Sequence, residues 1–176
     1  MKLSKVLITT ILITSIASAL PLPILSKKAF QNGSGVQVGL EAKLVNFDNA
    51  DIDGTIYGLK IGFQTMFGQS NFGLNWGFFA DYGNVKDYSV AEGGFFLAPK
   101  YNFNFSQKSI LSIYAGIQGK YVGIESSDGY GFVPYGGLEL SYGHWSIAAE
   151  YSTGTVSFES GDIDEDTFSG SINYRF

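Results

Sequence analysis

One short segment of the sequence carries residue types that could form a hydrolytic site. His144 precedes Trp145 and Ser146, and Glu150 follows four residues after the serine. These groups match a nucleophilic triad, in which the imidazole accepts the serine proton and the acid orients the imidazole. A single match within seven residues has little specificity, however, because motifs are hypotheses that need their structural context. We therefore interpret the three residues as structural and predict that the chain is not an enzyme.

Two acidic segments have the residue types of a metal site. Asp51 and Asp53, followed by Gly54, repeat the start of a calcium loop, but Lys60 occupies the position of the bidentate glutamate. The second segment, Asp162, Asp164 and Asp166, lacks the loop glycine. We predict no metal centre and no cofactor. These five aspartates are the candidates for weak binding of divalent cations.

The composition limits the classes of protein that the chain can represent. Its 176 residues include 23 glycines, 28 aromatic residues (15 Phe, 11 Tyr and 2 Trp) and no cysteine, and the net charge is −5. The absence of cysteine excludes disulfides, a thiol nucleophile and thiolate metal sites. The acidic balance argues against a nucleic-acid partner, which would need a basic face. The apolar content of 45% is too high for a disordered chain.

The N-terminal segment is predicted to be a targeting signal. Lys2 and Lys5 precede the apolar stretch Val6–Ile16, and Ala17-Ser18-Ala19 forms a cleavage site of small residues. We assign residues 1–19 to a signal peptide and residues 20–34 to a periplasmic leader. No second apolar run of 18 or more residues follows. An exported chain without a spanning helix is either soluble or a membrane β-barrel.

Alternation between apolar and polar or small residues runs from residue 35 to residue 176. In the first segment Val36, Val38 and Leu40 oppose Gln37, Gly39 and Glu41, which is the period of a β-strand. The pattern predicts eight strands, near residues 36–44, 57–64, 72–82, 89–103, 110–122, 130–142, 145–153 and 167–176. Pro99 and Pro134 lie inside two of these segments, where we expect β-bulges.

The sizes of the side chains decide which face points inward. The apolar face holds both tryptophans and most of the other aromatic residues, whereas the opposite face is rich in glycine. The interior of an eight-stranded barrel is only just wide enough for side chains, so it cannot hold that many rings. The apolar face therefore meets lipid. The predicted fold is all-β, an eight-stranded antiparallel up-and-down transmembrane β-barrel over residues 35–176, rather than a soluble lipocalin-like barrel.

The predicted inner face carries charges of both signs. Its acids and bases are Glu41, Asp81, Glu92, Glu139 and Glu150, and Lys43, Lys60, Lys100, Lys120 and Arg175. Buried charges need partners, so a balanced set predicts a network of salt bridges that fills the lumen. A path for protons or ions is the alternative reading of the same set.

The remaining acids, which include Asp87, Glu125, Asp128, Glu159 and Glu165, are assigned to longer connections at one end. Longer connections are typical of the extracellular end and tight turns of the periplasmic end, where both termini then lie. Aromatic residues near the strand ends predict two membrane girdles. The outer girdle comprises Phe47, Tyr57, Tyr82, Tyr88 and Tyr121, and the inner girdle comprises Phe103, Tyr142, Trp145, Tyr174 and Phe176.

The signal peptide, the eight alternating strands and the closing segment Ser171–Phe176 resemble the small Gram-negative outer-membrane barrels of the OmpA-domain and OmpX type, also described as opacity-type or porin-family proteins. The resemblance implies an outer-membrane location and contact with lipid and lipopolysaccharide. It also implies that Tyr174 and Phe176 form the signal read by the barrel-insertion machinery. His144-Trp145-Ser146 is similar to the motif of outer-membrane lipid A deacylases, but Ile147 replaces the asparagine of that family.

These observations favour a structural or cell-surface interaction role for an outer-membrane barrel with acidic extracellular loops and an extracellular ligand of unknown identity. A narrow pore for small solutes or ions is the first alternative, and a lipid A-modifying enzyme is the second.

Overall fold

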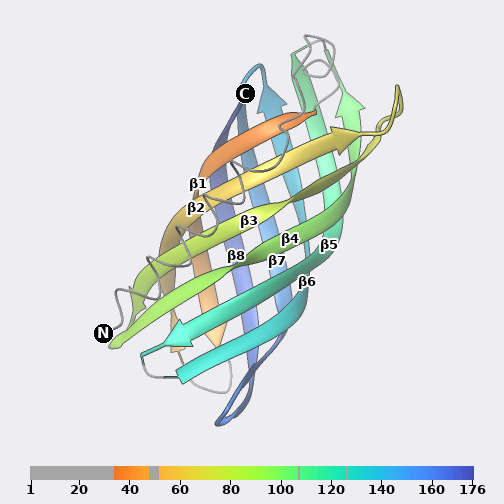
Figure 1. The fold of residues 1–176 in the computed structure, drawn as a ribbon. Helices are drawn as coiled ribbons and strands as arrows, with labels where there is room; N and C mark the ends of the chain where they lie inside the picture. The colour runs from red at the N-terminus through yellow and green to blue at the C-terminus, as the bar shows by residue number, and fades with distance from the viewer. Residues whose placement is uncertain (1–33, 48–51, 107, 126) are drawn as a thin grey trace.

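The computed structural model describes residues 34–47, 52–106, 108–125 and 127–176, which form a closed barrel of eight antiparallel strands. Each strand pairs with its neighbours in the sequence, and the last strand pairs with the first (Figure 1). The strands are β1 (Gly35–Phe47), β2 (Ile52–Met66), β3 (Phe72–Val85), β4 (Tyr88–Asn104), β5 (Ser109–Ile124), β6 (Ser127–Tyr142), β7 (Trp145–Phe158) and β8 (Gly161–Arg175). The predicted fold class is confirmed.

The alternation in the sequence determines which side chains point into the barrel. In β1, Leu40 is 68% exposed and its neighbour Glu41 is 5% exposed, because successive side chains of a strand point to opposite faces. The register carries the same face from strand to strand, since Glu41 lies opposite Gly58 and Gly58 lies opposite Asp81. Residues far apart in the sequence therefore line the lumen at one level.

The strands are longer and the outer connections shorter than the sequence analysis predicted. β4 has 17 residues, and only residues 86–87 join β3 to β4. Polar residues continue the ladder beyond the apolar segments: Asn46 pairs with Asp53, and Ser157 pairs with Asp162. The acids assigned to long connections were therefore misplaced in part, because strand pairing requires alternation but does not require apolar residues.

Neither proline causes the expected bulge. Pairing between β4 and β5 is interrupted at Ala98 and Pro99 and resumes at Lys100 in the same register. Pro134 remains opposite Ile117. A proline removes one hydrogen-bond donor, which a local break in one ladder accommodates without an extra residue.

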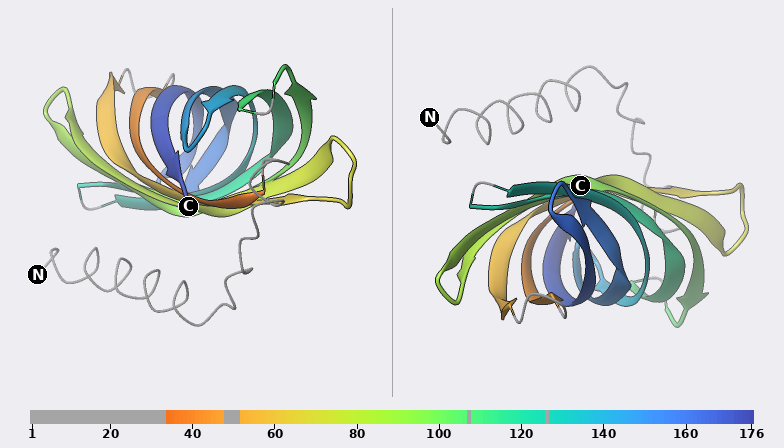
Figure 2. Two further views of the ribbon diagram at one scale, coloured as in Figure 1. Left: turned by 90° about the horizontal axis from the view of Figure 1, so that it is seen from above. Right: turned by 90° about the horizontal axis from the view of Figure 1, so that it is seen from below.

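The barrel closes where the C-terminal strand meets the N-terminal one. The Phe176 amide donates a hydrogen bond to the Val36 carbonyl at 2.9 Å, and Figure 2 shows the curved wall from two further sides. Among the described residues, no helix is long and apolar enough to cross a membrane. The predicted signal peptide and nearly all of the predicted leader lie outside the described residues.

Candidate functional site

The lumen holds the largest set of chemically active side chains in the described part of the chain. All ten charged residues assigned to the inner face lie inside the barrel, and each has between 2% and 7% of its surface exposed. They occupy successive levels along the barrel. We name its ends as the sequence analysis predicts them: the end that holds Gly35 and Phe176 is called periplasmic, and the opposite end extracellular.

Glu139 is the centre of the periplasmic level. Its carboxylate accepts hydrogen bonds from the amides of Gln37 at 2.6 Å and Gln64 at 2.9 Å, and from the Arg175 guanidinium at 3.2 Å. The Lys100 ammonium lies 3.6 Å away. One carboxylate therefore stands among two cations and two amide donors, which compensates for its removal from water.

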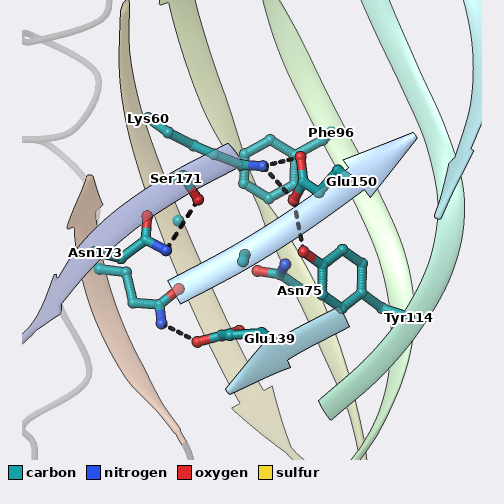
Figure 3. Close-up of a pocket in the computed structure, with 11 residues that line it drawn as sticks. Lys60, Asn75, Phe96, Tyr114, Glu139, Glu150, Ser171 and Asn173 are labelled. Carbon is teal, nitrogen blue, oxygen red and sulfur yellow. Dashed lines mark hydrogen bonds and ion pairs between the residues drawn. The ribbon is translucent and has the colours of Figure 1, made fainter. Parts of the chain in front are cut away.

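The middle level contains a close ion pair. The Lys60 ammonium lies 2.5 and 2.6 Å from the two oxygens of Glu150, and the Tyr114 hydroxyl donates to the same carboxylate at 2.7 Å (Figure 3). The ammonium also lies 4.6 Å from the centre of the Phe96 ring, within the range of a cation–π interaction. Tyr114 and Phe96 come from the inner faces of β5 and β4, so two large rings lie among the glycines that the sequence predicts for the lumen.

A small cavity separates the Glu150 carboxylate from that of Glu139 (Figure 3). Its accessible volume is about 10 Å³, which corresponds to a single water site. The Asn75 amide lines it, and its oxygen is buried and accepts no hydrogen bond. The cavity is too small for a hydrated ion.

Lys43 is the centre of the next level toward the extracellular end. Its ammonium lies 2.7 Å from Asp81, 3.2 Å from Glu92 and 3.6 Å from Glu41. It also lies 3.9 Å from the centre of the Phe79 ring. Three carboxylates thus approach one ammonium at this level.

Glu165 also belongs to this level, although the sequence analysis placed it in an extracellular connection. It is 2% exposed, lies 2.5 Å from the Lys120 ammonium and accepts a hydrogen bond from Thr167. The earlier placement was wrong because β8 begins at Gly161. The sequence already indicates this placement, because Glu165 is four residues before the lumen residue Ser169, and residues an even number of positions apart in a strand point to the same face.

An apolar cluster fills the lumen beyond the charges, at the extracellular end. We call it the apolar plug; its members are Val45, Phe47, Ile56, Val85, Val90, Val122, Ile124, Val156 and Phe158, each at most 9% exposed. Phe47 was predicted to belong to the outer aromatic girdle, but it is fully buried in the plug. The prediction of a lumen filled by salt bridges alone was therefore incomplete.

The outer surface changes character at the same level. Tyr57 lies opposite Tyr82 and Tyr121 opposite Tyr130, all with exposed side chains. On the periplasmic side of these tyrosines the exterior is apolar, with residues such as Leu59 exposed. On the extracellular side the outward positions are polar; they include Asn46, Asn84, Thr155, Ser157 and Asp164. Tyrosines at such a transition are typical of a membrane–water interface.

The residues considered for hydrolysis point to different sides of the wall. The Ser146 hydroxyl lies inside the lumen and accepts hydrogen bonds from Gln37 and Asn173. The His144 ring stacks on Tyr174, whose side chain is on the outer face, and its Nδ1 lies 2.8 Å from the Arg175 carbonyl oxygen. Glu150 is bonded to Lys60 in the middle of the lumen. This arrangement does not have the geometry of a triad.

The described metal candidates have partners of other kinds. Asp53 lies 3.2 Å from Lys86, Asp164 accepts a hydrogen bond from Thr155, and Asp166 accepts one from Tyr151. Asp162 is exposed at the start of β8, and Asp51 lies outside the described residues. Within the described ranges, no group of three or more histidine, cysteine or acidic side chains could hold a metal ion.

The proposed insertion signal lies at the periplasmic rim. Tyr174 is half-buried and contacts Trp145 and Phe176, with ring centres 5.0 and 5.1 Å apart. Phe176 is 56% exposed.

Known barrels share this architecture. Ail, the attachment invasion locus protein of Yersinia pestis, superimposes with a TM-score of 0.54 at 16% identity, over 81% of this chain and 97% of that one. Ail has also been solved with the heparin analogue sucrose octasulfate, with a TM-score of 0.53. Neisserial surface protein A gives a TM-score of 0.53 at 12% identity, over 80% of this chain and 96% of that one. No protein-family model and no curated protein sequence matches the chain.

These similarities concern the backbone, because the identities are low. They confirm at the level of fold the resemblance that the sequence suggested. The chain has the fold of the small eight-stranded outer-membrane β-barrels, and its apolar exterior is the one that such a location requires.

Proposed function

We propose that the protein is a sealed outer-membrane barrel with a structural or cell-surface interaction role. The observation that carries this proposal is the continuous filling of the lumen. Paired charges and aromatic rings occupy its membrane-embedded part, and the apolar plug occupies its extracellular end. Conduction requires a path along which ions can move with water or substitute ligands, and the lumen formed by the described residues, with a cavity of about 10 Å³, offers none.

The test is ion conductance in planar bilayers. We expect no current steps from the purified barrel, under conditions in which an open porin conducts. Current steps that disappear in Glu139→Gln would refute the sealed state and favour the narrow pore.

The extracellular end supports an interaction role because it presents many exposed acids. The described ones are Asp53, Asp87, Glu125, Asp128, Glu159, Asp162 and Asp164. The Ail structure contains a sulfated, polyanionic ligand. The extracellular end of this chain is acidic, so we propose that its partners are cationic, since opposite charges attract across an interface.

This part of the proposal is tested with barrels in neutral lipid vesicles. We expect polylysine to bind, the binding to weaken with salt, and heparin not to bind. The double change Asp162→Asn with Asp164→Asn lowers the polylysine affinity, whereas Ser157→Ala on the same outer face leaves it unchanged. Equal binding of polylysine and heparin would contradict the proposal.

We also propose that Tyr174 and Phe176 direct insertion into the outer membrane, as the family resemblance implies. Phe176→Ala is expected to slow assembly in cells. Phe105→Ala is the matched control, since Phe105 is a phenylalanine of similar exposure in the β4–β5 turn. Equal assembly rates for the two variants would remove the special role of the C-terminal residue.

A further inference from the structure

The lumen contains more negative than positive groups. Its buried carboxylates are Glu41, Asp81, Glu92, Glu139, Glu150 and Glu165, and its buried cations are Lys43, Lys60, Lys100, Lys120 and Arg175. Among the described residues, six acids therefore stand against five bases. The balanced set predicted from the sequence lacks Glu165, which lies inside the barrel.

The excess is located around Lys43. At the periplasmic level two cations share Glu139, whereas the carboxylates of Asp81, Glu92 and Glu41 all lie within 3.6 Å of the Lys43 ammonium. The carboxylate of Glu41 lies 3.6 Å from Lys43 and 3.8 Å from Lys60, and its Oε1 accepts no hydrogen bond. The Oδ1 atom of Asp81 is likewise buried without a hydrogen bond, so Glu41 and Asp81 are both incompletely compensated.

Glycine at position 58 brings Glu41 and Asp81 to the same ammonium. Gly58 lies between them in the register, opposite Glu41 on β1 and opposite Asp81 on β3. A Cβ atom at Gly58 would overlap the Asp81 carboxylate, so Asp81 occupies the space that a side chain would have filled. The two acids therefore converge above one glycine and beside one lysine.

All eight strands contribute titratable or charged side chains that face this point. They are Glu41 and Lys43 from β1, Lys60 from β2, Asp81 from β3, Glu92 from β4, Lys120 and Tyr114 from β5, Tyr135 from β6, Glu150 from β7 and Glu165 from β8. The apolar plug lies on one side, and the rings of Phe79 and Phe96 lie against Lys43 and Lys60. In such a low-dielectric interior, an uncompensated carboxylate is neutralised by a proton rather than buried as an ion.

We propose that the lumen binds one exchangeable proton, held at Asp81 beside Lys43 and Glu41, which makes the interior of the barrel electrically neutral. A proton fits better than a metal cation because the Lys43 ammonium already lies among these carboxylates, and no group of three or more acidic or histidine side chains among the described residues is arranged to hold a metal ion. The site is a property of the folded barrel, and it does not depend on the proposed surface partner.

The proposal predicts how stability changes with pH. The folded barrel holds a proton that the unfolded chain releases above about pH 4. The stabilising contribution of this proton is therefore fully present below about pH 4, and it is lost as the pH rises through the titration of the site in the folded barrel. Urea unfolding in lipid vesicles, measured from about pH 5 to about pH 9, should show the folding equilibrium constant falling by up to tenfold per pH unit.

Substitutions distinguish this site from general charge effects. Asp81→Asn and Glu41→Gln each remove the excess charge, so each should flatten the pH profile and make the barrel more stable than wild type at alkaline pH. Glu139→Gln is the matched control: it leaves two cations without their carboxylate, and it should destabilise the barrel at every pH and retain the wild-type slope. His144→Gln should also retain the slope, which separates the site from the sole histidine.

Three results would overturn the proposal. The first is a wild-type stability that does not change with pH, and the second is an Asp81→Asn variant that loses as much stability as Glu139→Gln. The third is a stability that depends on sodium rather than on pH when sodium chloride replaces N-methylglucamine chloride, which would identify a metal cation. If Asp81→Asn does not fold, infrared spectra of the wild-type barrel decide: a protonated carboxyl band must be present at neutral pH and vanish at alkaline pH.

Discussion

The two ends of the barrel use the same strands in opposite ways. On the periplasmic side of the exposed tyrosines, charges and amides face inward, and apolar residues such as Leu59 and Leu138 face outward. On the extracellular side, valines face inward, and residues such as Thr155 and Ser157 face outward. The first arrangement suits a wall surrounded by lipid and the second suits a wall surrounded by water. One continuous sheet is thus adapted to two solvents.

The transition leaves a mark in the sequence. The alternation of orientation continues, but the apolar residues change from outward to inward positions, so two consecutive apolar residues appear. Leu44 is 57% exposed and the adjacent Val45 is 2% exposed; Tyr121 is 41% exposed and Val122 is fully buried. Such pairs, together with tyrosines on the outer face, indicate where each strand leaves the membrane.

The largest expected effect concerns the interior of the extracellular end. Phe47→Ala removes a fully buried ring from the apolar plug and should lower the free energy of unfolding by about 3–5 kcal/mol. Ser157→Ala, on the outer face at the same end, should change it by less than about 0.5 kcal/mol. Urea unfolding in lipid vesicles measures both. Equal losses would show that the plug is not a packed core.

A charge placed on the outer face tests the position of the transition. Leu59→Arg, in the apolar band, should lower the free energy of unfolding by about 2–4 kcal/mol because the guanidinium enters hydrocarbon. Thr155→Arg, beyond the tyrosines, should change it by less than about 1 kcal/mol because water surrounds the new charge. The same unfolding assay compares them. A harmless Leu59→Arg would mean that the outer face had been assigned wrongly.

Overpacking separates the crowded lumen from the lipid face. A Cβ atom at Gly77 would overlap the Ile61 carbonyl and approach the Phe96 ring, so Gly77→Ala should cost about 1–3 kcal/mol. A Cβ atom at Gly170 would lie 4.0 Å from its nearest neighbour, the Ala148 carbonyl oxygen, so Gly170→Ala should be close to neutral. Equal unfolding midpoints of the two variants in urea would contradict this view.

The sequence predicted the fold because period-two alternation alone specifies which side chains share a face. The positions of Leu59, Glu139 and Lys60 followed from parity, and the width of an eight-stranded barrel decided which face is inside. None of these inferences required knowledge of pairing partners.

The contents of the lumen were less predictable, for two physical reasons. Parity does not give the length of a strand, so Glu165 was assigned to a connection although it lies inside the barrel. The rule that apolar side chains face lipid also applies only within the membrane, so Phe47 was placed outside although it is buried in the plug. Which lysine contacts which acid depends on the stagger between strands, as the pairing of Lys60 with Glu150 across the barrel illustrates.

The smallest expected effect concerns the ion pair between Lys86 and Asp53 at the extracellular rim. The two charged groups are 3.2 Å apart, and their side chains are 42% and 70% exposed. Water and salt screen such a pair, so Lys86→Ala should lower the free energy of unfolding by about 0–1 kcal/mol, and added salt should reduce even that difference. Alanine keeps the Cβ atom at this position, whose φ of 52° is left-handed, so the substitution leaves the backbone strain unchanged. A larger loss in urea unfolding would show that the extracellular rim is stabilised by its ion pair rather than by the apolar plug beneath it.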